Sequence, residues 1–165
     1  MRPLLSRWPA LLAVISASLL AGPALAASAA TPAVSLHVTP QGQLDLSDWK
    51  DKVVYVDFWA SWCGPCKQSF PWMIDAQNRF AKRGFVVVGV NVDKDPELAA
   101  RFLKQFNPPF PIAYDPDGLL ADKMKVAGMP TSMIFDRHGK VRFVHTGFRQ
   151  EERSELENEI NTLLK

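Results

Sequence analysis

Two apolar runs stand out in the hydropathy pattern of the chain. Residues 53–60 (VVYVDFWA) are interrupted only by Asp57, and residues 85–92 (FVVVGVNV) form a second run of the same length. A continuous apolar run, in place of strict alternation, is typical of a strand that is covered on both faces, as in a largely parallel sheet. We therefore expect two buried central strands with helices on either side.

Helical spacing of apolar residues predicts three longer helices. The first begins near Cys66 and ends at Gly84. The second is capped by Asp95, with Pro96 at its first position and Glu97 in its first turn. The third is a polar C-terminal helix whose apolar stripe fits core packing better than a partner site. The apolar positions are Phe70, Met73, Ile74 and Phe80 in the first helix, Leu98, Phe102 and Phe106 in the second, and Leu156, Ile160, Leu163 and Leu164 in the third.

The segment between the second and third helices contains a strand, a short helix and a hairpin. A cluster of three prolines ends the second helix, and a short strand at 112–114 leads through a turn at 115–118 into a helix that ends near Lys125. Strands at 131–135 and 141–146 flank a tight turn and predict an antiparallel hairpin. Alternating strands and helices, followed by a hairpin and a helix, predict an α/β sandwich around a central mixed sheet.

The charge balance argues against a nucleic acid partner. The formal net charge is +2, but two of the 19 basic residues are Arg2 and Arg7 near the N-terminus, which leaves 17 basic against 17 acidic residues in the rest of the chain. A neutral domain lacks the basic face that phosphates require. The length of 165 residues and the apolar content of 47% suit one domain with a single core.

The N-terminal segment has the pattern of an export signal. Two arginines precede an apolar stretch at 10–21, and Ala24-Leu25-Ala26 has the small-x-small form of a signal peptidase site. We expect residues 1–26 to be a cleaved signal peptide and residues 27–165 to be the exported domain. The apolar stretch is shorter than the about 20 residues that a membrane span needs, so retention as an anchor is the less favoured alternative.

Cys63 and Cys66 are the two cysteines of the chain, in the sequence Trp62-Cys63-Gly64-Pro65-Cys66. The pair falls where a buried strand should end and a helix begin. At a helix N-terminus, unpaired N–H groups and the positive end of the helix dipole stabilise an anion, so the Cys63 thiol should ionise readily. Cys66, one turn further along, is expected to be the more buried, resolving thiol. The pattern predicts thiol–disulfide exchange with Cys63 as the catalytic nucleophile.

Two other uses of cysteine fit the sequence poorly. A zinc site would need two more ligands, and the three histidines, His37, His138 and His145, form no second knuckle. A peroxidase would need a Pro-x-x-x-Thr/Ser element before a single reactive cysteine, but the residue seven positions before Cys63 is Val56. We therefore expect no metal and no cofactor.

The residues around the cysteine pair resemble the active-site strand and turn of thioredoxin. The match runs from Val56 to Lys67 (VDFWASWCGPCK), and two further landmarks keep the register. Pro71 lies where thioredoxins carry a proline in the active-site helix, and Gly128-Met129-Pro130-Thr131 is similar to the segment that holds their cis-proline. The resemblance covers the chain from about Leu44 to its C-terminus. It implies a thioredoxin fold, with a central mixed β-sheet flanked by helices.

Within that superfamily the chain resembles the exported TlpA/ResA-like branch. The leader, the Phe70-Pro71-Trp72-Met73 segment and a long stretch from Asp93 to Pro130 carry this resemblance. It implies a strand–helix insertion, which the strand at 112–114 and the helix near Leu119 would supply. It also implies a periplasmic thiol:disulfide oxidoreductase that reduces disulfides in client proteins, often in cytochrome c or cytochrome oxidase assembly. A membrane electron donor of the DsbD/CcdA kind would re-reduce it, and we expect a monomer.

Two positions depart from the TlpA/ResA-like pattern. Ser69 stands where this branch usually has Glu, and Asp57 occupies the place of thioredoxin's buried acid, where the branch often has Asn. The lysine that pairs with that acid in thioredoxin is replaced here by Gly89. An unpaired carboxyl group in an apolar strand should have a raised pKa, so Asp57 is expected to exchange protons with Cys66. The alternative is a structural hydrogen bond from Asp57 to backbone or water.

Substrate contacts are expected around the first cysteine. By resemblance, the peptide bond before Pro130 is cis and presents the backbone of Met129 beside Cys63, where an extended client segment could pair with it as an added strand. Exposed apolar side chains would surround the sulfur as a docking patch, whereas Trp59 belongs to the core. The expected substrate-binding residues are Trp62, Gly64, Pro65, Met129 and Pro130.

Two rival functions are also compatible with the sequence. An oxidase of the DsbA kind would run the same chemistry in the opposite direction. The Gly-Pro dipeptide between the cysteines resembles that of the reducing members, but it does not by itself fix the reduction potential. A chaperone or metal-delivery module of the same fold would not need the Cys63 thiol. The absence of Met/His clusters argues against a dedicated copper role.

Overall fold

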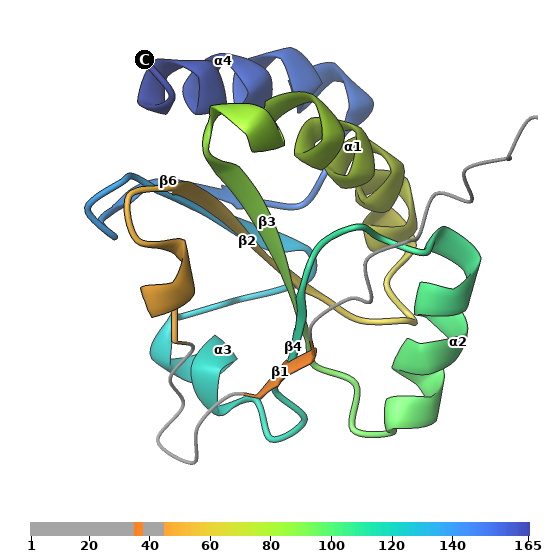
Figure 1. The fold of residues 1–165 in the computed structure, drawn as a ribbon. Coiled ribbons are helices and arrows are strands. Elements are labelled where there is room, and N and C mark those ends of the chain that lie inside the picture. The colour runs from red at the N-terminus through yellow and green to blue at the C-terminus, as the bar shows by residue number, and fades with distance from the viewer. Residues whose placement is uncertain (1–34, 38–44) are drawn as a thin grey trace, which may run out of the picture.

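A six-stranded mixed sheet forms the centre of the protein, as seen in the computed structural model, which describes residues 35–37 and 45–165 (Figure 1). The strand order is β1-β4-β3-β2-β5-β6. Strands β1, β4, β3 and β2 run parallel to one another, whereas β5 is antiparallel to both β2 and β6. The strands are β1 (Ser35–His37), β2 (Val53–Trp59), β3 (Phe85–Asn91), β4 (Ile112–Tyr114), β5 (Thr131–Phe135) and β6 (Val141–Thr146).

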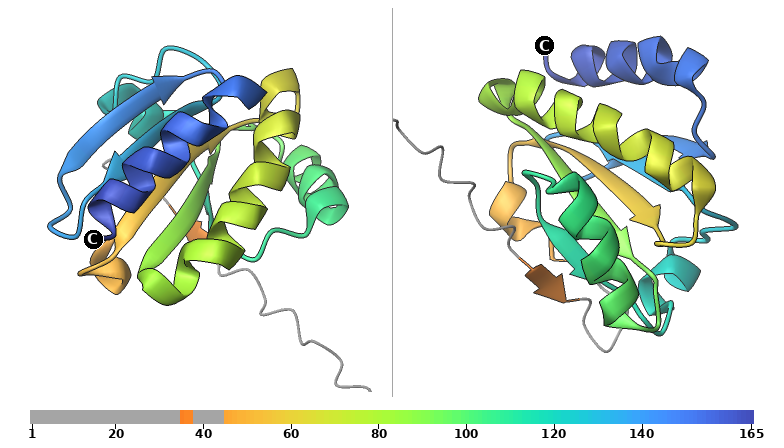
Figure 2. Two further views of the ribbon diagram at one scale, coloured as in Figure 1. Left: turned by 90° about the horizontal axis from the view of Figure 1, so that it is seen from above. Right: turned by 90° about the vertical axis from the view of Figure 1, so that its right-hand side faces the viewer.

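In the part of the chain that the structure describes, four α-helices cover the two faces of this sheet. The helices are α1 (Gly64–Phe80), α2 (Pro96–Phe106), α3 (Leu119–Lys123) and α4 (Arg153–Leu163). Buried side chains of α1, α2 and α4 belong to the hydrophobic cluster on one face. Those of α3 belong to the cluster on the other face, together with half-buried Trp49 of a short 3-10 helix (Ser47–Trp49) and Leu46 just before it. Figure 2 shows α1 and α4 lying side by side over the sheet. This is the expected thioredoxin-type sandwich.

Strand β2 is buried along its whole length, because its two faces serve two separate clusters. Val53, Tyr55 and Trp59 pack with α1, α2 and α4, whereas Val54 and Phe58 pack on the side of α3. Burying one such large side chain contributes about 1.5–3 kcal/mol. Two buried faces explain why the sequence of this strand shows a continuous apolar run.

Helix α1 begins two residues earlier than the apolar spacing suggested. Cys63 is its N-cap residue, and Gly64 and Pro65 occupy the first two helical positions. The helix gives way to a 3-10 turn (Ala81–Arg83), and Gly84 ends it with φ +89°, a conformation that favours glycine. The predicted stop at this glycine is confirmed.

The segment between α2 and the hairpin forms the expected strand and short helix, β4 and α3. Asp95 caps α2 by accepting a hydrogen bond from the Glu97 N–H at 2.9 Å, as predicted. The buried carboxylate of Asp115 caps α3, accepting from the Leu120 N–H at 3.2 Å and the Ala121 N–H at 2.9 Å. Each acid thus fixes the start of its helix through backbone N–H groups of the first turn.

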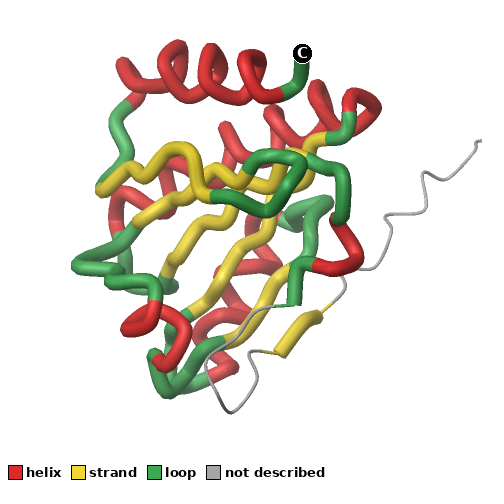
Figure 3. The backbone as a smooth tube through the Cα atoms, turned by 90° about the vertical axis from the view of Figure 1, so that its left-hand side faces the viewer, coloured by secondary structure: helices red, strands yellow, loops and turns green. Residues whose placement is uncertain are grey.

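Strand β1 was not predicted, and it lies at the edge of the sheet beside β4 (Figure 3). Its three residues pair in parallel register with Ile112, Ala113 and Tyr114. The expected signal peptide (1–26) lies outside the described residues. Within the described part of the chain, no helix has the length and apolar character needed to cross a membrane.

Candidate active site

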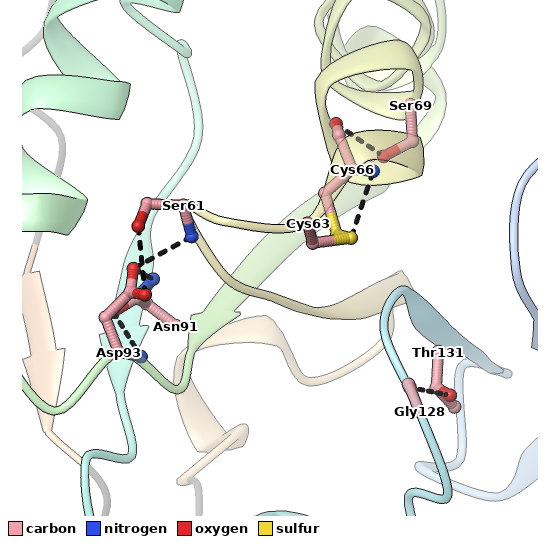
Figure 4. Close-up of a disulfide and its surroundings, with 8 residues drawn as sticks. All are labelled: Ser61, Cys63, Cys66, Ser69, Asn91, Asp93, Gly128 and Thr131. Carbon is pink, nitrogen blue, oxygen red and sulfur yellow. Dashed lines mark hydrogen bonds between the residues drawn. A yellow bond between two sulfur atoms is a disulfide. The ribbon is translucent and has the colours of Figure 1, made fainter.

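Cys63 and Cys66 lie where the central strand β2 ends and α1 begins (Figure 4). They are joined by a disulfide with an S–S distance of 2.04 Å and a Cα–Cα distance of 5.3 Å. Cys63 is 4% exposed and Cys66 is fully buried, which is the expected order of accessibility. The structure therefore shows the oxidised form of a dithiol centre, in which Cys63, and not Cys66, reaches the protein surface.

The sulfur of Cys63 takes part in capping α1. Its Sγ accepts a hydrogen bond from the backbone N–H of Cys66 at 3.2 Å. No acidic side chain lies in the first turn of this 17-residue helix to compete for its positive end. After reduction, the same N–H group and the helix dipole would stabilise a thiolate on Cys63.

Ser69 stands where the TlpA/ResA-like pattern has glutamate, and its hydroxyl group makes a hydrogen bond to the backbone. Its hydroxyl donates a hydrogen bond to the carbonyl oxygen of Cys66 at 3.1 Å, and the side chain is fully buried. This position of α1 therefore brings no carboxyl group to the cysteines. Any acid near Cys66 must come from another element.

Asp57 is the buried acid that β2 supplies. The side chains two residues before and after it, Tyr55 and Trp59, belong to the cluster that contains both cysteines, so Asp57 points to the same face of the sheet. It is 1% exposed, and within the described part of the chain its Oδ2 atom has no hydrogen-bond partner. Burial raises the pKa of this carboxyl group well above its ordinary value. Such a carboxyl group holds its proton to a higher pH than an exposed one does, and its carboxylate is a stronger base.

Gly89 explains why no cation faces Asp57 from β3. The two residues are direct partners in the register of β2 and β3. A Cβ atom on Gly89 would lie 2.9 Å from Cδ1 of Ile112 and 3.0 Å from Nε1 of Trp59. The space beside this glycine is thus filled by core side chains, and a lysine of the thioredoxin kind has no room there.

The loop before β5 lies at the same edge of the sheet as the cysteines. Because β2 and β5 are antiparallel and Phe58 pairs with Thr131, the start of β5 is adjacent to the end of β2. The Met129–Pro130 peptide bond is cis, which confirms the expectation from the family resemblance. The Thr131 hydroxyl donates to the Gly128 carbonyl at 2.7 Å (Figure 4). The Pro130 carbonyl accepts from the Gly147 N–H at 2.8 Å.

Met129 contributes free backbone groups and part of an apolar surface. Its N–H and C=O make no hydrogen bond to another residue in the ranges 35–37 and 45–165. Its side chain is half-buried and packs against both core clusters. A backbone with free hydrogen-bonding groups at the edge of the site is suited to pairing with an extended peptide.

Trp62 is the most exposed large apolar side chain that the structure describes, at 69%. Gly64 and Pro65, on the other side of Cys63, are also exposed. By contrast, Trp59 is fully buried, with ring centroids 4.9 Å from Phe70 and 4.7 Å from Phe102. The predicted division of the two tryptophans between core and surface matches their burial.

Three polar residues beside the motif were not foreseen from the sequence. Ser61, Asn91 and Asp93 form a hydrogen-bonded cluster next to the cysteine turn (Figure 4). The sequence held one sign of this cluster, since Asp93 directly follows the apolar run at 85–92. Parallel neighbouring strands end at the same edge of a sheet, so a residue there lies beside the cysteine turn. Within residues 35–37 and 45–165, no group of three or more His, Cys, Asp and Glu side chains could hold a metal ion.

Comparison with known proteins relates the chain to one family of thiol-dependent proteins. The model of the Redoxin family matches residues 26–160. The thiol-disulfide oxidoreductase ResA of Bacillus subtilis (strain 168) is 35% identical over 116 residues, which are 70% of this chain and 65% of that protein. The ResA protein of Bacillus thuringiensis subsp. konkukian (strain 97-27) is 31% identical over 99 residues, which are 60% of this chain and 57% of that protein.

A solved structure is similar over most of both chains. The protein, assigned as the thiol:disulfide interchange protein DsbE of Chlorobium tepidum, superposes with a TM-score of 0.72 at 48% sequence identity. The match covers 74% of this chain and 86% of that one. The chain spans less than two thirds of the length of the two ResA relatives, at 65% and 57%.

Proposed function

The chain belongs to the Redoxin family, as a TlpA/ResA-like thioredoxin-family protein, and from this premise we propose that it is a thiol:disulfide oxidoreductase whose redox centre is the Cys63/Cys66 pair. One observation carries the proposal: Cys63 Sγ caps the N-terminus of α1 and accepts the Cys66 N–H at 3.2 Å. A sulfur in that position is prepared to carry negative charge, and the thiolate is the nucleophile in disulfide exchange.

The reaction proceeds through a mixed disulfide. The Cys63 thiolate attacks one sulfur of a client disulfide, so that an S–S bond forms between enzyme and client and one client thiolate leaves. The Cys66 thiolate then attacks Cys63 Sγ, which releases the second client sulfur and closes the disulfide seen in the structure. Two electrons pass from the enzyme to the client, and the departing client thiolates take up two protons.

Asp57 supplies the proton transfer that the second step needs. Cys66 is fully buried, and a thiol in apolar surroundings resists ionisation. Asp57 faces the same side of the sheet and has a raised pKa, so its carboxylate is a stronger base than an exposed one. We assign Asp57 the role of accepting the Cys66 proton when the mixed disulfide is resolved.

The client docks around Cys63 on an apolar surface. Exposed Trp62 precedes Cys63, exposed Gly64 and Pro65 follow it, and half-buried Met129 and buried Pro130 lie at the neighbouring strand end. The free backbone groups of Met129 would pair with an extended client segment and bring its disulfide to Cys63.

We assign the reductive direction and an extracytoplasmic location to this chemistry. The Gly-Pro dipeptide between the cysteines supports the direction, and the signal-like pattern of residues 1–26 supports the location. After cleavage the protein would act in the periplasm as a monomer, on client proteins that include those of cytochrome c or cytochrome oxidase assembly. A membrane electron donor of the DsbD/CcdA kind would return it to the dithiol form.

Trapping of the mixed disulfide tests the proposal. The Cys66→Ser variant is mixed with a protein that contains accessible disulfides, such as insulin, and the products are separated under non-reducing conditions. A covalent complex that dithiothreitol dissolves is expected, and the matched Cys63→Ser variant should form none. The proposal is wrong if Cys66→Ser forms no complex while its Cys63 thiol still reacts with iodoacetamide, or if Cys63→Ser still reduces insulin.

A further inference from the structure

Asp93 is a buried carboxylate that the exchange chemistry described above does not use. It lies two residues beyond the end of β3 and is 4% exposed. Its Oδ2 atom accepts hydrogen bonds from the Ser61 backbone N–H at 2.9 Å and from Asn91 Nδ2 at 2.8 Å, and its Oδ1 atom accepts from the Ser61 hydroxyl at 3.0 Å (Figure 4). The Asp93 N–H in turn donates to Asn91 Oδ1 at 3.1 Å. A carboxylate removed from water needs donors of this kind, and it is Ser61 that supplies two of the three.

Ser61 belongs to the turn that leads from β2 to the first cysteine. The Cys63 N–H donates to the Ala60 carbonyl at 3.1 Å, which closes a turn over residues 60–63 with Ser61 at its second position. The Val92 N–H donates to the Trp59 carbonyl at 3.0 Å, so the pairing of β2 and β3 continues to the start of this turn. Asp93 also links this turn to the end of β3, through the two hydrogen bonds that its carboxylate accepts from Ser61. We call these two hydrogen bonds the clamp.

The position of the Cys63 sulfur depends on this turn. Cys63 directly follows Trp62, has an extended backbone with φ −82° and ψ 112°, and uses its Sγ to cap α1. A cap of this kind requires the residue before the helix to keep its backbone angles, since a small rotation moves the side chain off the helix axis. In the oxidised protein the disulfide to Cys66 also holds the sulfur. Once it is reduced, the turn and the single hydrogen bond from the Cys66 N–H are what remain.

We propose that Asp93 is a positioning residue for the Cys63 thiolate, which it holds at the N-terminus of α1 by clamping Ser61 in the turn before it. The inference deepens the proposed function and rests on it, because it takes Cys63 as the nucleophile. Asp93 does not touch the sulfur; it acts through the backbone of residues 61–63.

The clamp and the charge of Asp93 have opposite effects on Cys63, which makes them separable. A carboxylate near a thiolate disfavours the anion, so removing the charge alone would make Cys63 more acidic. Loss of the clamp would make Cys63 less acidic, because the sulfur leaves the helix N-terminus. Asn at position 93 removes the charge but can keep the bonds: its oxygen accepts from the Ser61 N–H and Asn91, and its amide donates to the Ser61 hydroxyl, which can also accept.

The test is the pH dependence of Cys63 alkylation in the reduced full-length protein. Iodoacetamide is added between pH 4 and 9, and modification of Cys63 is followed by mass spectrometry of the peptide that contains it. We expect Asp93→Ala to raise the pH midpoint and to slow alkylation at pH 6 by roughly threefold to tenfold, the size of a helix-terminus interaction. Asp93→Asn, which keeps the hydrogen bonds and loses the charge, should not raise the midpoint and should leave it unchanged or slightly lowered. Ser61→Ala, which loses the hydroxyl bond but keeps the N–H bond, should shift the midpoint in the same direction by less.

Each other outcome overturns the inference. A lowered midpoint in both Asp93 variants would mean that the charge of Asp93 dominates its effect on Cys63. An unchanged midpoint in Asp93→Ala would mean that Asp93 has a structural role alone. If reduced Asp93→Ala does not fold, Ser61→Ala decides, and an unchanged midpoint there also overturns the inference. The proposed function fails separately, if the unmodified protein itself shows the midpoint of a free thiol, about 8.5.

Discussion

Asp57 and Gly89 are direct partners across β2 and β3, so the buried carboxyl group faces a residue that offers it no side chain. The space that a side chain at position 89 would fill is taken by Ile112 and Trp59. Asp57 thus has neither a cation nor, at Oδ2, a hydrogen-bond donor in the described structure, and burial alone raises its pKa. This pairing leads to the first three predictions.

The stability of the protein should fall with rising pH because of Asp57. Its pKa in the folded state is raised above the unfolded value of about 3.9, so the ionised form is disfavoured only in the folded state. Stability is therefore full below about pH 4 and is lost as the pH rises through the folded pKa. Asp57→Asn removes this loss. The free energy of unfolding of the variant, minus that of the unmodified protein, should therefore be larger at pH 8 than at pH 4, by about 1–3 kcal/mol.

Urea denaturation of the oxidised protein at the two pH values measures this difference. Asp117→Asn, an exposed acid in the turn before α3, is the matched control for the loss of one negative charge. A difference between Asp57→Asn and the unmodified protein that is the same at pH 4 and pH 8 would contradict the buried, unpartnered state of this carboxyl group.

Asp57→Asn should also slow the resolving step. Without a base, the buried Cys66 thiol must lose its proton to solvent, and general base catalysis is typically worth roughly 10²–10⁴ in rate. Stopped-flow measurement after mixing the reduced variant with a disulfide substrate should show formation of the mixed disulfide near its normal rate and decay at least about tenfold slower. Equal slowing of both steps would indicate a general defect in place of proton transfer to Asp57.

Gly89→Ala should destabilise the protein although alanine is a small residue. The added Cβ would press on Ile112 Cδ1 at 2.9 Å and Trp59 Nε1 at 3.0 Å, and both belong to the packed core. Overpacking of this kind typically costs about 1–3 kcal/mol. Gly64→Ala is the control, because nothing lies within 4 Å of its added Cβ. Equal unfolding midpoints of the two variants would show that the space beside Gly89 is not filled as described.

Trp62→Ala should weaken reaction with protein clients more than with small disulfides. The side chain is 69% exposed beside Cys63, and aromatic anchors of interfaces commonly contribute a loss of about tenfold or more in affinity when truncated. The ratio of kcat/KM for insulin to that for a small aromatic disulfide should therefore fall. Val144→Ala, 56% exposed on β6, is the control and should leave the ratio unaltered. An unaltered ratio for Trp62→Ala would remove it from the docking surface.

The sequence predicted the elements whose cause is local. The hairpin strands at 131–135 and 141–146 were predicted at their observed bounds, because the two strands and the tight turn between them are neighbours in the sequence. Asp95 and Gly84 likewise set helix ends through their own side chain or backbone. The start of α1 was misplaced by two residues, because its cap is a cysteine sulfur and not a usual capping oxygen.

Features that depend on distant residues were missed. Strand β1 has only three residues and exists through its pairing with β4, which lies more than seventy positions away. The contact between Ser61 and Asp93 spans 32 positions and depends on β2 and β3 ending at the same edge. The role of Ser69 as a donor to the Cys66 carbonyl required the helix geometry, because the sequence showed only that the usual glutamate was absent.

The reduction potential of the Cys63/Cys66 couple is the most direct test of the proposed reductive function. The protein is equilibrated in dithiothreitol redox buffers, and the fraction of dithiol is read by alkylation. A value near that of thioredoxin, about −270 mV, is predicted. A value near that of DsbA, about −120 mV, would contradict the assignment and would make the protein an oxidant of its clients.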